Sequence, residues 1–171
     1  MKDIASQPRI VNKTNNTQFN VMNYLNTECK DAMDFNEFID TFDFTLEDID
    51  TLSNKGYQES MERTFLKKLR DMDKTKRPIH CSDMKRKSFY VKENGVWVRD
   101  TDGKRMIRGV KRFSGRHFIS LNQWRIHNPD YHDNDRKFKY HFNAMHQACR
   151  CNDMAHVKKI INKMTGLSVK G

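Results

Sequence analysis

The pattern of apolar and polar positions predicts helices in the N-terminal third of the chain. Apolar residues recur at helical spacing on one face, namely Phe35, Phe38, Ile39 and Phe42. Asp34 and Glu37, three residues apart, form the capping pattern that begins a helix. Thr45 and Asp48 repeat this pattern before a second helix, which ends at the glycine at position 56.

The pattern changes to β-structure between residues 76 and 103. A third helix over 57–72 is ended by Pro78. Aromatic and β-branched residues then concentrate in three short strands, at 79–82, 88–92 and 96–99. Asn94-Gly95 separates the last two strands and is a strong hairpin signal. We therefore expect a β-hairpin or a three-stranded antiparallel sheet at about residues 79–99.

Helical spacing returns after residue 103. The next apolar face is formed by Met106, Val110, Phe113 and His117. Gly115 weakens this helix, so a break is predicted near Ser114-Gly115. The apolar residues of the second piece, Ile119, Trp124 and Ile126, are expected to be partly buried. Asn128-Pro129 ends that piece, and two further helices are predicted, through 140–148 and around 155–164.

These elements predict one mostly helical α+β domain with helices on both sides of the sheet in sequence. Residues 1–18 are polar and rich in Asn and Thr, which predicts a flexible arm. The domain spans residues 19–171 and has three parts: an acidic helical part (19–75), the hairpin (76–103) and a basic helical part (104–171).

Charge is distributed unevenly along this chain of 171 residues and net charge +10. Residues 1–61 contain 5 Lys or Arg and 11 Asp or Glu, whereas residues 62–171 contain 27 and 11. Such asymmetry favours a polyanionic partner, most commonly nucleic acid, or pairing between the two parts of the chain. A solvated basic surface and an acidic protein partner are the alternatives.

The candidate nucleic-acid-binding residues flank the hairpin. No acidic residue lies between Asp102 and Asp130. The candidates are Lys85, Arg86, Lys87, Lys104, Arg105, Arg108, Lys111, Arg112 and Arg116. If the basic helix packs beside the hairpin, these cations converge on one face, with Tyr90 or Trp97 as an aromatic contact. We therefore expect non-specific binding, with DNA as the favoured partner.

Cysteine and histidine suggest a zinc site only weakly. The ligand types of His146, Cys149, Cys151 and His156 suit tetrahedral zinc. Their spacing matches no common zinc finger, and two cysteines two positions apart on a helix point in different directions. His80 and Cys81 are strand neighbours with opposite orientations, so Cys81 is interpreted as a small core residue. Neither a metal nor another cofactor is predicted.

An enzymatic function is the weaker interpretation. A metal-dependent nuclease would use His127 and His132 with Asp130 and Asp133, a group that is more simply interpreted as a polar loop after Pro129.

The chain has no apolar run of about 20 residues and no signal-peptide pattern. We expect an intracellular protein with reduced thiols, neither secreted nor bound to a membrane.

Two runs, NYLNTECKDAMDFNEFID and KRPIHCSDMKRKSFYVKENGVW, resemble a family of uncharacterised proteins encoded by giant nucleocytoplasmic DNA viruses. The resemblance covers roughly residues 20–130, and its most specific block is RPIHC-x-D-x-KR-x-x-x-YVK. In that family the region often follows a C2H2-type zinc finger, which this chain lacks. The resemblance implies a viral origin, a location in the viral factory or virion, and an association with nucleic-acid-binding proteins.

The alternative function is a virion structural or assembly protein, or an oligomerisation module that binds protein partners. Such a protein needs an apolar face that remains after its core is complete. The aromatic residues that would supply it are Phe19, Phe35, Phe38, Phe42 and Phe44. Self-association is therefore a second possible partner interaction.

Overall fold

The computed structural model describes residues 20–169, so the arm at 1–18 and Phe19 lie outside the described residues. The chain is α+β and mostly helical, as predicted. The elements before the sheet are α1 (Val21–Thr27), α2 (Phe35–Asp40), α3 (Leu46–Lys55), α4 (Tyr57–Met61), the π-helical η1 (Glu62–Leu66), α5 (Lys67–Asp71) and η2 (Lys74–Lys76). The sheet contains β1 (Ile79–Asp83), β2 (Ser88–Glu93) and β3 (Val96–Asp100). The elements after it are α6 (Lys104–His127), η3 (Pro129–His132), α7 (Asp135–Ala148), η4 (Cys149–Asn152) and α8 (Met154–Met164).

The predicted capping patterns begin α2 and α3. The backbone N–H of Asp34 donates to Glu37 Oε2 at 3.2 Å. The backbone N–H of Thr45 donates to Asp48 Oδ2 at 2.7 Å, and Asp48 N–H donates back to Thr45 Oγ1 at 3.3 Å. Gly56 ends α3 with a φ of 88°, a value that glycine adopts without strain. Local sequence therefore sets where these two helices begin and where α3 ends.

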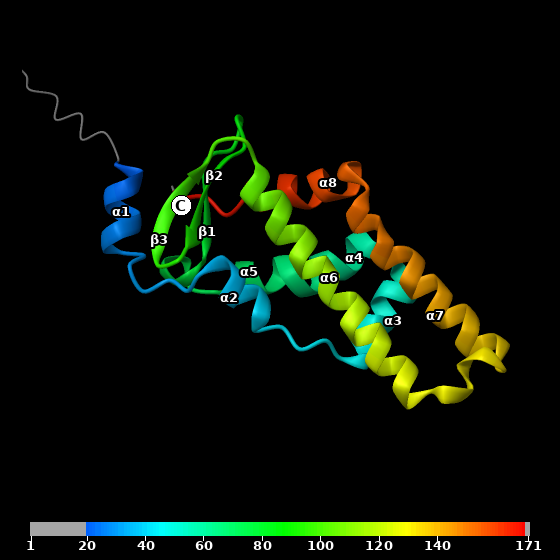
Figure 1. Ribbon diagram of the computed structural model, residues 1–171. Helices are drawn as coiled ribbons and strands as arrows, with labels where there is room; N and C mark the ends of the chain where they lie inside the picture. The colour runs from blue at the N-terminus through cyan, green and yellow to red at the C-terminus, as the bar shows by residue number, and fades with distance from the viewer. Residues whose placement is uncertain (1–19, 170–171) are drawn as a thin grey trace, which may run out of the picture.

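The three strands form one antiparallel sheet in the order β1-β2-β3. Asn94 and Gly95 both have positive φ, 51° and 76°, which fits the two-residue turn that favours Asn-Gly. The outer edge of β1 is paired with the C-terminal segment: Cys81 N–H donates to Leu167 O at 2.7 Å, and Val169 N–H donates to Cys81 O at 3.1 Å. The end of the described chain thus lies beside the sheet (Figure 1).

Both faces of the sheet are covered. Phe89 and Val91 face the main core, which α2, α4, α5, α6 and α8 complete. Trp97 and the half-buried Tyr90 face the opposite side, where α1 packs with Leu25. The predicted alternation of Phe89 and Val91 against Tyr90 is therefore correct.

The phenylalanines of the N-terminal part are core residues. Phe35, Phe38 and Phe42 are buried, and Phe44 packs against the same cluster. The prediction that they supply an exposed apolar face is wrong for Phe35, Phe38 and Phe42. Their rings pack against Phe65 and Phe113 on other helices, so these aromatic residues belong to the main core.

Helix α6 is continuous over Lys104–His127, so the predicted break near Ser114-Gly115 is wrong. The helix does not break because packing supports its small residues: Ser114 Oγ lies 2.8 Å from Val110 O and 2.8 Å from the Tyr57 hydroxyl. The prediction that Ile119 and Ile126 are partly buried is also wrong, because each residue is 60% exposed. Trp124 is partly buried, as predicted.

Helix α6 connects the two ends of the molecule (Figure 1). Its 24 residues correspond to a length of about 36 Å. The N-terminal end of α6 lies by the sheet, and its C-terminal half packs with α3 and α7 around Leu52, Leu121 and Ala144. Helix α8 and the β1–β2 turn (residues 84–87) lie at the end of the molecule that contains the sheet, which we call the sheet end, and the turn projects from it.

Candidate nucleic-acid interface

Lys85, Arg86 and Lys87 form the projecting turn between β1 and β2. All three side chains are exposed. The turn is held by the Arg86 N–H, which donates to Asp83 Oδ1 at 2.9 Å, and by a left-handed residue, Lys87, with a φ of 52°. Arg86 Nε lies 3.9 Å from Asp83 Oδ2, a long surface ion pair. Lys85 and Lys87 form no ion pair within 4 Å in the described part of the chain, although the charge of Lys85 also acts on the carboxylate of Asp83.

A buried carboxylate fixes the start of α6 against the sheet. Asp100, 3% exposed, accepts the backbone N–H groups of Arg105 at 3.2 Å and Met106 at 3.0 Å. These are N–H groups that a helix cannot satisfy internally. Lys104 forms an ion pair with Asp102 at 2.8 Å, which raises the pKa of the lysine amine. The predicted cations at 104 and 105 are thus placed beside the hairpin, as expected.

Three α6 cations form ion pairs with other elements, two of them with Asp40 of the acidic N-terminal part. Arg112 Nη2 lies 2.9 Å from Asp40 Oδ2, and Arg116 Nη1 lies 3.4 Å from Asp40 Oδ1. Arg105 Nε pairs with Glu93 at 2.9 Å. Of the two possibilities that the charge asymmetry leaves open, pairing between the two parts of the chain accounts for Arg112 and Arg116.

Arg108 belongs to the same acidic environment. It lines a hollow together with Asp34, Glu37 and Glu93, although no ion pair within 4 Å is formed. Lys111 also forms no ion pair among residues 20–169. Burial raises the pKa of the Cys151 thiol, and the nearby charge of Lys111 opposes part of that rise. Within residues 20–169, five of the nine candidates therefore form an ion pair within 4 Å and four do not.

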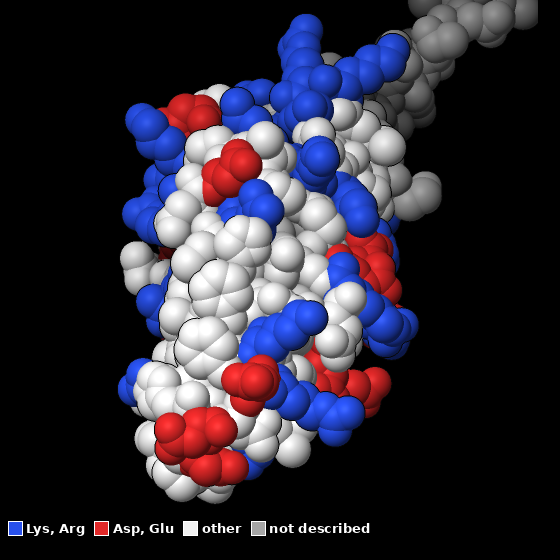
Figure 2. All heavy atoms as spheres, turned by 90° about the vertical axis from the view of Figure 1, so that its right-hand side faces the viewer, with Lys and Arg blue, Asp and Glu red and all other residues white. Residues whose placement is uncertain are grey.

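Two further cations at the sheet end escaped the sequence interpretation. Lys158 and Lys159 on α8 are exposed and have no ion pair in the described part of the chain. Between Val157 and Ile160, which are buried, these positions are the outward side of an amphipathic helix. Figure 2 shows Lys and Arg side chains crowding the end where α8 and the β1–β2 turn lie, with larger acidic patches towards the other end.

The proposed aromatic contacts are not free to stack on bases. Trp97 is 7% exposed, and its ring lies 5.5 Å from the ring of His80 beneath α1. Tyr90 is half-buried in the same cluster. Trp97 is therefore a packing residue and does not serve as the predicted aromatic contact.

A buried thiol–imidazole pair lies in that cluster. Cys29 Sγ is 3.6 Å from His80 Nε2, and both side chains are fully buried. Burial raises the pKa of the Cys29 thiol and lowers the pKa of His80 to about 4, so both groups are neutral at pH 7. The 51 residues between them hide this contact from the sequence. Cys81 faces the opposite side of the sheet and is a core residue, as predicted.

The zinc candidates are not brought together. His146 and Cys149 are exposed, Cys151 is buried, and His156 Nδ1 lies 3.2 Å from Gln58 Nε2. No group of three or more His, Cys, Asp or Glu residues within 20–169 is arranged to hold a metal ion. The residues of the nuclease hypothesis, His127, Asp130, His132 and Asp133, form no such group either. The carboxylate of Asp130 instead accepts a hydrogen bond from Lys137 Nζ at 2.7 Å.

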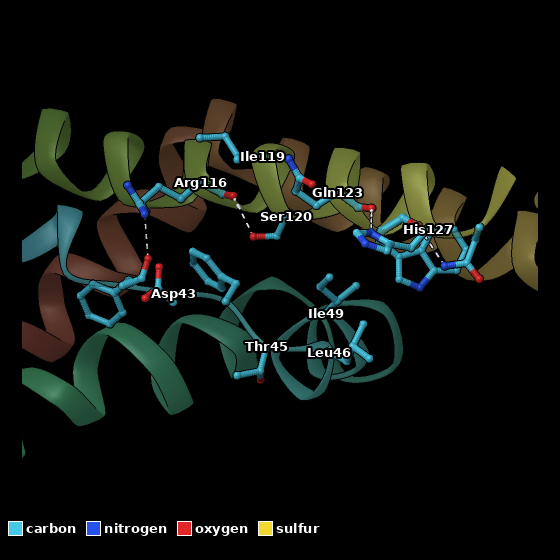
Figure 3. A pocket seen from close by; sticks show the side chains of 13 residues that line it. Asp43, Thr45, Leu46, Ile49, Arg116, Ile119, Ser120, Gln123 and His127 are labelled. Atoms are coloured by element: carbon cyan, nitrogen blue, oxygen red, sulfur yellow. Dashed lines mark hydrogen bonds between the residues drawn. The ribbon is translucent and has the colours of Figure 1, made fainter.

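A large cleft lies away from this basic end. It has a volume of about 650 Å³ and runs between α3 with its preceding segment and the C-terminal half of α6. Figure 3 shows Asp43, Thr45, Leu46 and Ile49 on one side and Arg116, Ser120, Gln123 and His127 of α6 on the other. Arg116 Nη2 donates to Phe42 O at 2.7 Å and anchors one end of the cleft.

Comparisons of the chain with protein-family models, with curated proteins and with solved structures gave no match. Across the described residues, every helix is too short or too polar to span a lipid bilayer.

Proposed function

We propose that this chain is a non-enzymatic protein that binds nucleic acid through the basic sheet end, by phosphate contacts that do not read base sequence. The observation that carries the proposal is a set of cations at that end that form no ion pair within 4 Å among residues 20–169: Lys85, Lys87, Lys111, Lys158 and Lys159. Cations without a protein partner are the ones that can release counterions from a phosphate backbone.

The paired cations contribute less to this surface than the sequence suggests. Arg112 and Arg116 share the carboxylate of Asp40, so a phosphate at those positions must compete with an existing ion pair. The interface proposed from the structure therefore shifts from the length of α6 towards the turn and α8. A viral origin and a location inside the infected cell belong to the same proposal and rest on the resemblance of the block around the turn.

The test is binding of a fluorescently labelled DNA duplex followed by anisotropy. We expect Lys85→Gln combined with Lys87→Gln to weaken binding by a similar factor for unrelated sequences, because phosphate contacts carry no base information. Lys55→Gln is the matched control: Lys55 is an exposed lysine at the end of α3 that forms no ion pair with the residues the structure describes. Equal binding by the double variant and the wild type would refute the role of the turn.

A second candidate function, protein binding, is favoured by an exposed aromatic pair on α7. Phe138 and Phe142 are 47% and 59% exposed, and their rings stack with centroids 6.3 Å apart. Exposed aromatics of this kind are typical of interaction surfaces. Replacing both by serine should leave the free energy of unfolding nearly unchanged while removing any association that depends on α7.

A further inference from the structure

A buried thiol and a buried imidazole meet between α1 and the sheet. Cys29 lies just after the end of α1, and His80 lies on β1. Cys29 Sγ is 3.6 Å from His80 Nε2, and both residues are 0% exposed. Thiolate and imidazole are both metal ligands, and thiolate selects soft ions. The pair therefore presents two ligand atoms side by side in a place that water does not reach.

The contact between the two side chains indicates which atoms can coordinate an ion. Nε2 of His80 faces Cys29, and the backbone oxygen of Lys74 acts on the ring and favours a proton on it. We assign that proton to Nδ1, although no full hydrogen bond to Nδ1 forms among the described residues. In this tautomer the lone pair of Nε2 accepts the thiol proton, and the same lone pair can bind a metal ion.

The surrounding charges distinguish a monovalent ion from a divalent one. Within the described residues, three cations and one carboxylate act electrostatically on the pair: Lys74, Arg77, Lys92 and Glu28. A thiolate with a monovalent ion has no net charge, so it can be buried beside these cations without repulsion. A divalent ion would leave a net positive charge buried among cations, which is costly.

Two ligands and an apolar shell suit Cu(I) rather than zinc. Structural zinc takes four ligands, and the described residues contain no group of three or more His, Cys, Asp or Glu that could hold a metal ion. Leu25, Trp97 and Val169 are buried in the same cluster and keep water out. Met22 packs against this cluster, and its thioether is a further soft donor. Thiolate and thioether ligands select Cu(I) among the biological metals.

The fit requires a small local movement. Bonds of about 2.3 Å to sulfur and 2.0 Å to nitrogen place collinear ligand atoms about 4.3 Å apart, about 0.7 Å more than the observed 3.6 Å. Cys29 can supply that movement because its segment follows a helix of only seven residues and packs in a cluster separate from the main core. Local opening of this short helix also gives the ion a route to the pair.

We propose that Cys29 and His80 form a two-coordinate site for a soft monovalent metal ion, with Cu(I) as the ion that fits. On binding, the S–H bond of Cys29 breaks, a sulfur–metal bond forms, and the proton is released to solvent. The ion would link residues that are 51 positions apart and tie the segment after α1 to β1. This inference goes beyond the proposed function, because the site uses none of the candidate nucleic-acid-binding residues.

Anaerobic titration of the full chain with Cu(I), in competition with the coloured Cu(I) chelator bicinchoninate, tests the proposal. All samples carry Cys149→Ser, because Cys149 is exposed and can bind soft ions by itself. Cys29→Ala and His80→Gln, added separately, each remove one ligand. Cys81→Ala is the matched control, because Cys81 is also a buried cysteine beside His80 in sequence but faces the main core. Circular dichroism establishes that each variant is folded.

The Cys149→Ser background and the Cys81→Ala control should each retain one equivalent of Cu(I) and release one proton per ion, whereas Cys29→Ala and His80→Gln should lose that equivalent. X-ray absorption of the loaded background protein should show nitrogen together with sulfur around the ion, a result that does not depend on the folding of any ligand variant. Loss of all Cu(I) from the background protein to the chelator, full retention by Cys29→Ala, or coordination by sulfur alone would overturn the proposal. Equal retention of Zn(II) would overturn the selectivity for a monovalent ion.

Discussion

Gly109 of α6 lies directly against the Phe35 ring of α2, and Gly109→Ala tests that packing. A Cβ atom there would lie 2.0 Å from Cε1 and 2.6 Å from Cζ of Phe35. Carbon atoms in contact prefer about 3.5–4.0 Å, so the ring must move by about 1.5 Å. Phe35 is 2% exposed and packs against Phe65, so free space for that movement is lacking.

The magnitude follows from two opposing effects. Overpacking a closed core costs about 1–3 kcal/mol, and the short distance places this substitution at the upper end. Replacing glycine by alanine inside a helix returns about 1 kcal/mol. The net loss in the free energy of unfolding is therefore about 1–2 kcal/mol, measured by urea denaturation.

Gly115→Ala provides the control in the same helix. A Cβ atom at Gly115 has nothing within 4 Å, so only the helix gain applies and stability should rise by about 0.5–1 kcal/mol. Phe35→Leu should reduce the cost of Gly109→Ala in a double-mutant cycle, because it removes the clashing ring atoms. The packing argument fails if Gly109→Ala is as stable as the wild type.

Three further predictions follow from buried groups. His80 and His117 have pKa values lowered to about 4 by burial, against about 6.5 when unfolded. Between pH 6.5 and 4 the unfolded chain therefore binds more protons than the folded chain. The free energy of unfolding should fall as pH decreases through this range, by about 1.4 kcal/mol per pH unit for each histidine. Equal stability at pH 7 and pH 5 would contradict this. Asp100→Ala should cost about 1–3 kcal/mol, because two helix N–H groups lose their acceptor, and a chemical-denaturation midpoint equal to wild type would refute the cap. Cys149 is exposed and should react first with a thiol reagent. The other three cysteines are buried, burial raises their pKa values, and they should react only on unfolding: Cys29, Cys81 and Cys151. Equal reaction rates for all four thiols would contradict the buried positions.

Features that depend on neighbouring residues were predictable from the sequence. The caps at Asp34 and Thr45, the Asn94-Gly95 turn and the three strands are all set by side chains within a few residues of each other. The error at Ser114-Gly115 has a tertiary cause. Small residues in α6 weaken an isolated helix, but Tyr57 and Phe35 pack closely against them.

The candidate surface was predictable only in part, because charge along a sequence does not reveal which charges meet. The turn at Lys85–Lys87 could be named from composition, and its two lysines form no ion pair within 4 Å among the described residues. Asp40 meets Arg112 and Arg116 across separations of 72 and 76 residues, and no local pattern encodes that contact. The cleft between α3 and α6 is likewise invisible in the sequence, where Ile119 reads as a core residue.

The most direct test of the proposed nucleic-acid interface is the dependence of duplex-DNA affinity on salt concentration. The logarithm of the association constant should fall linearly with the logarithm of salt concentration, with a slope of about −0.9 for each phosphate contacted. Replacing Lys85 and Lys87 by glutamine should make that slope shallower by about 2, whereas Arg112→Gln, which breaks an existing ion pair with Asp40, should change it little. Affinity that does not fall with salt, or an equal change of slope for Arg112→Gln and the double variant, would contradict the account.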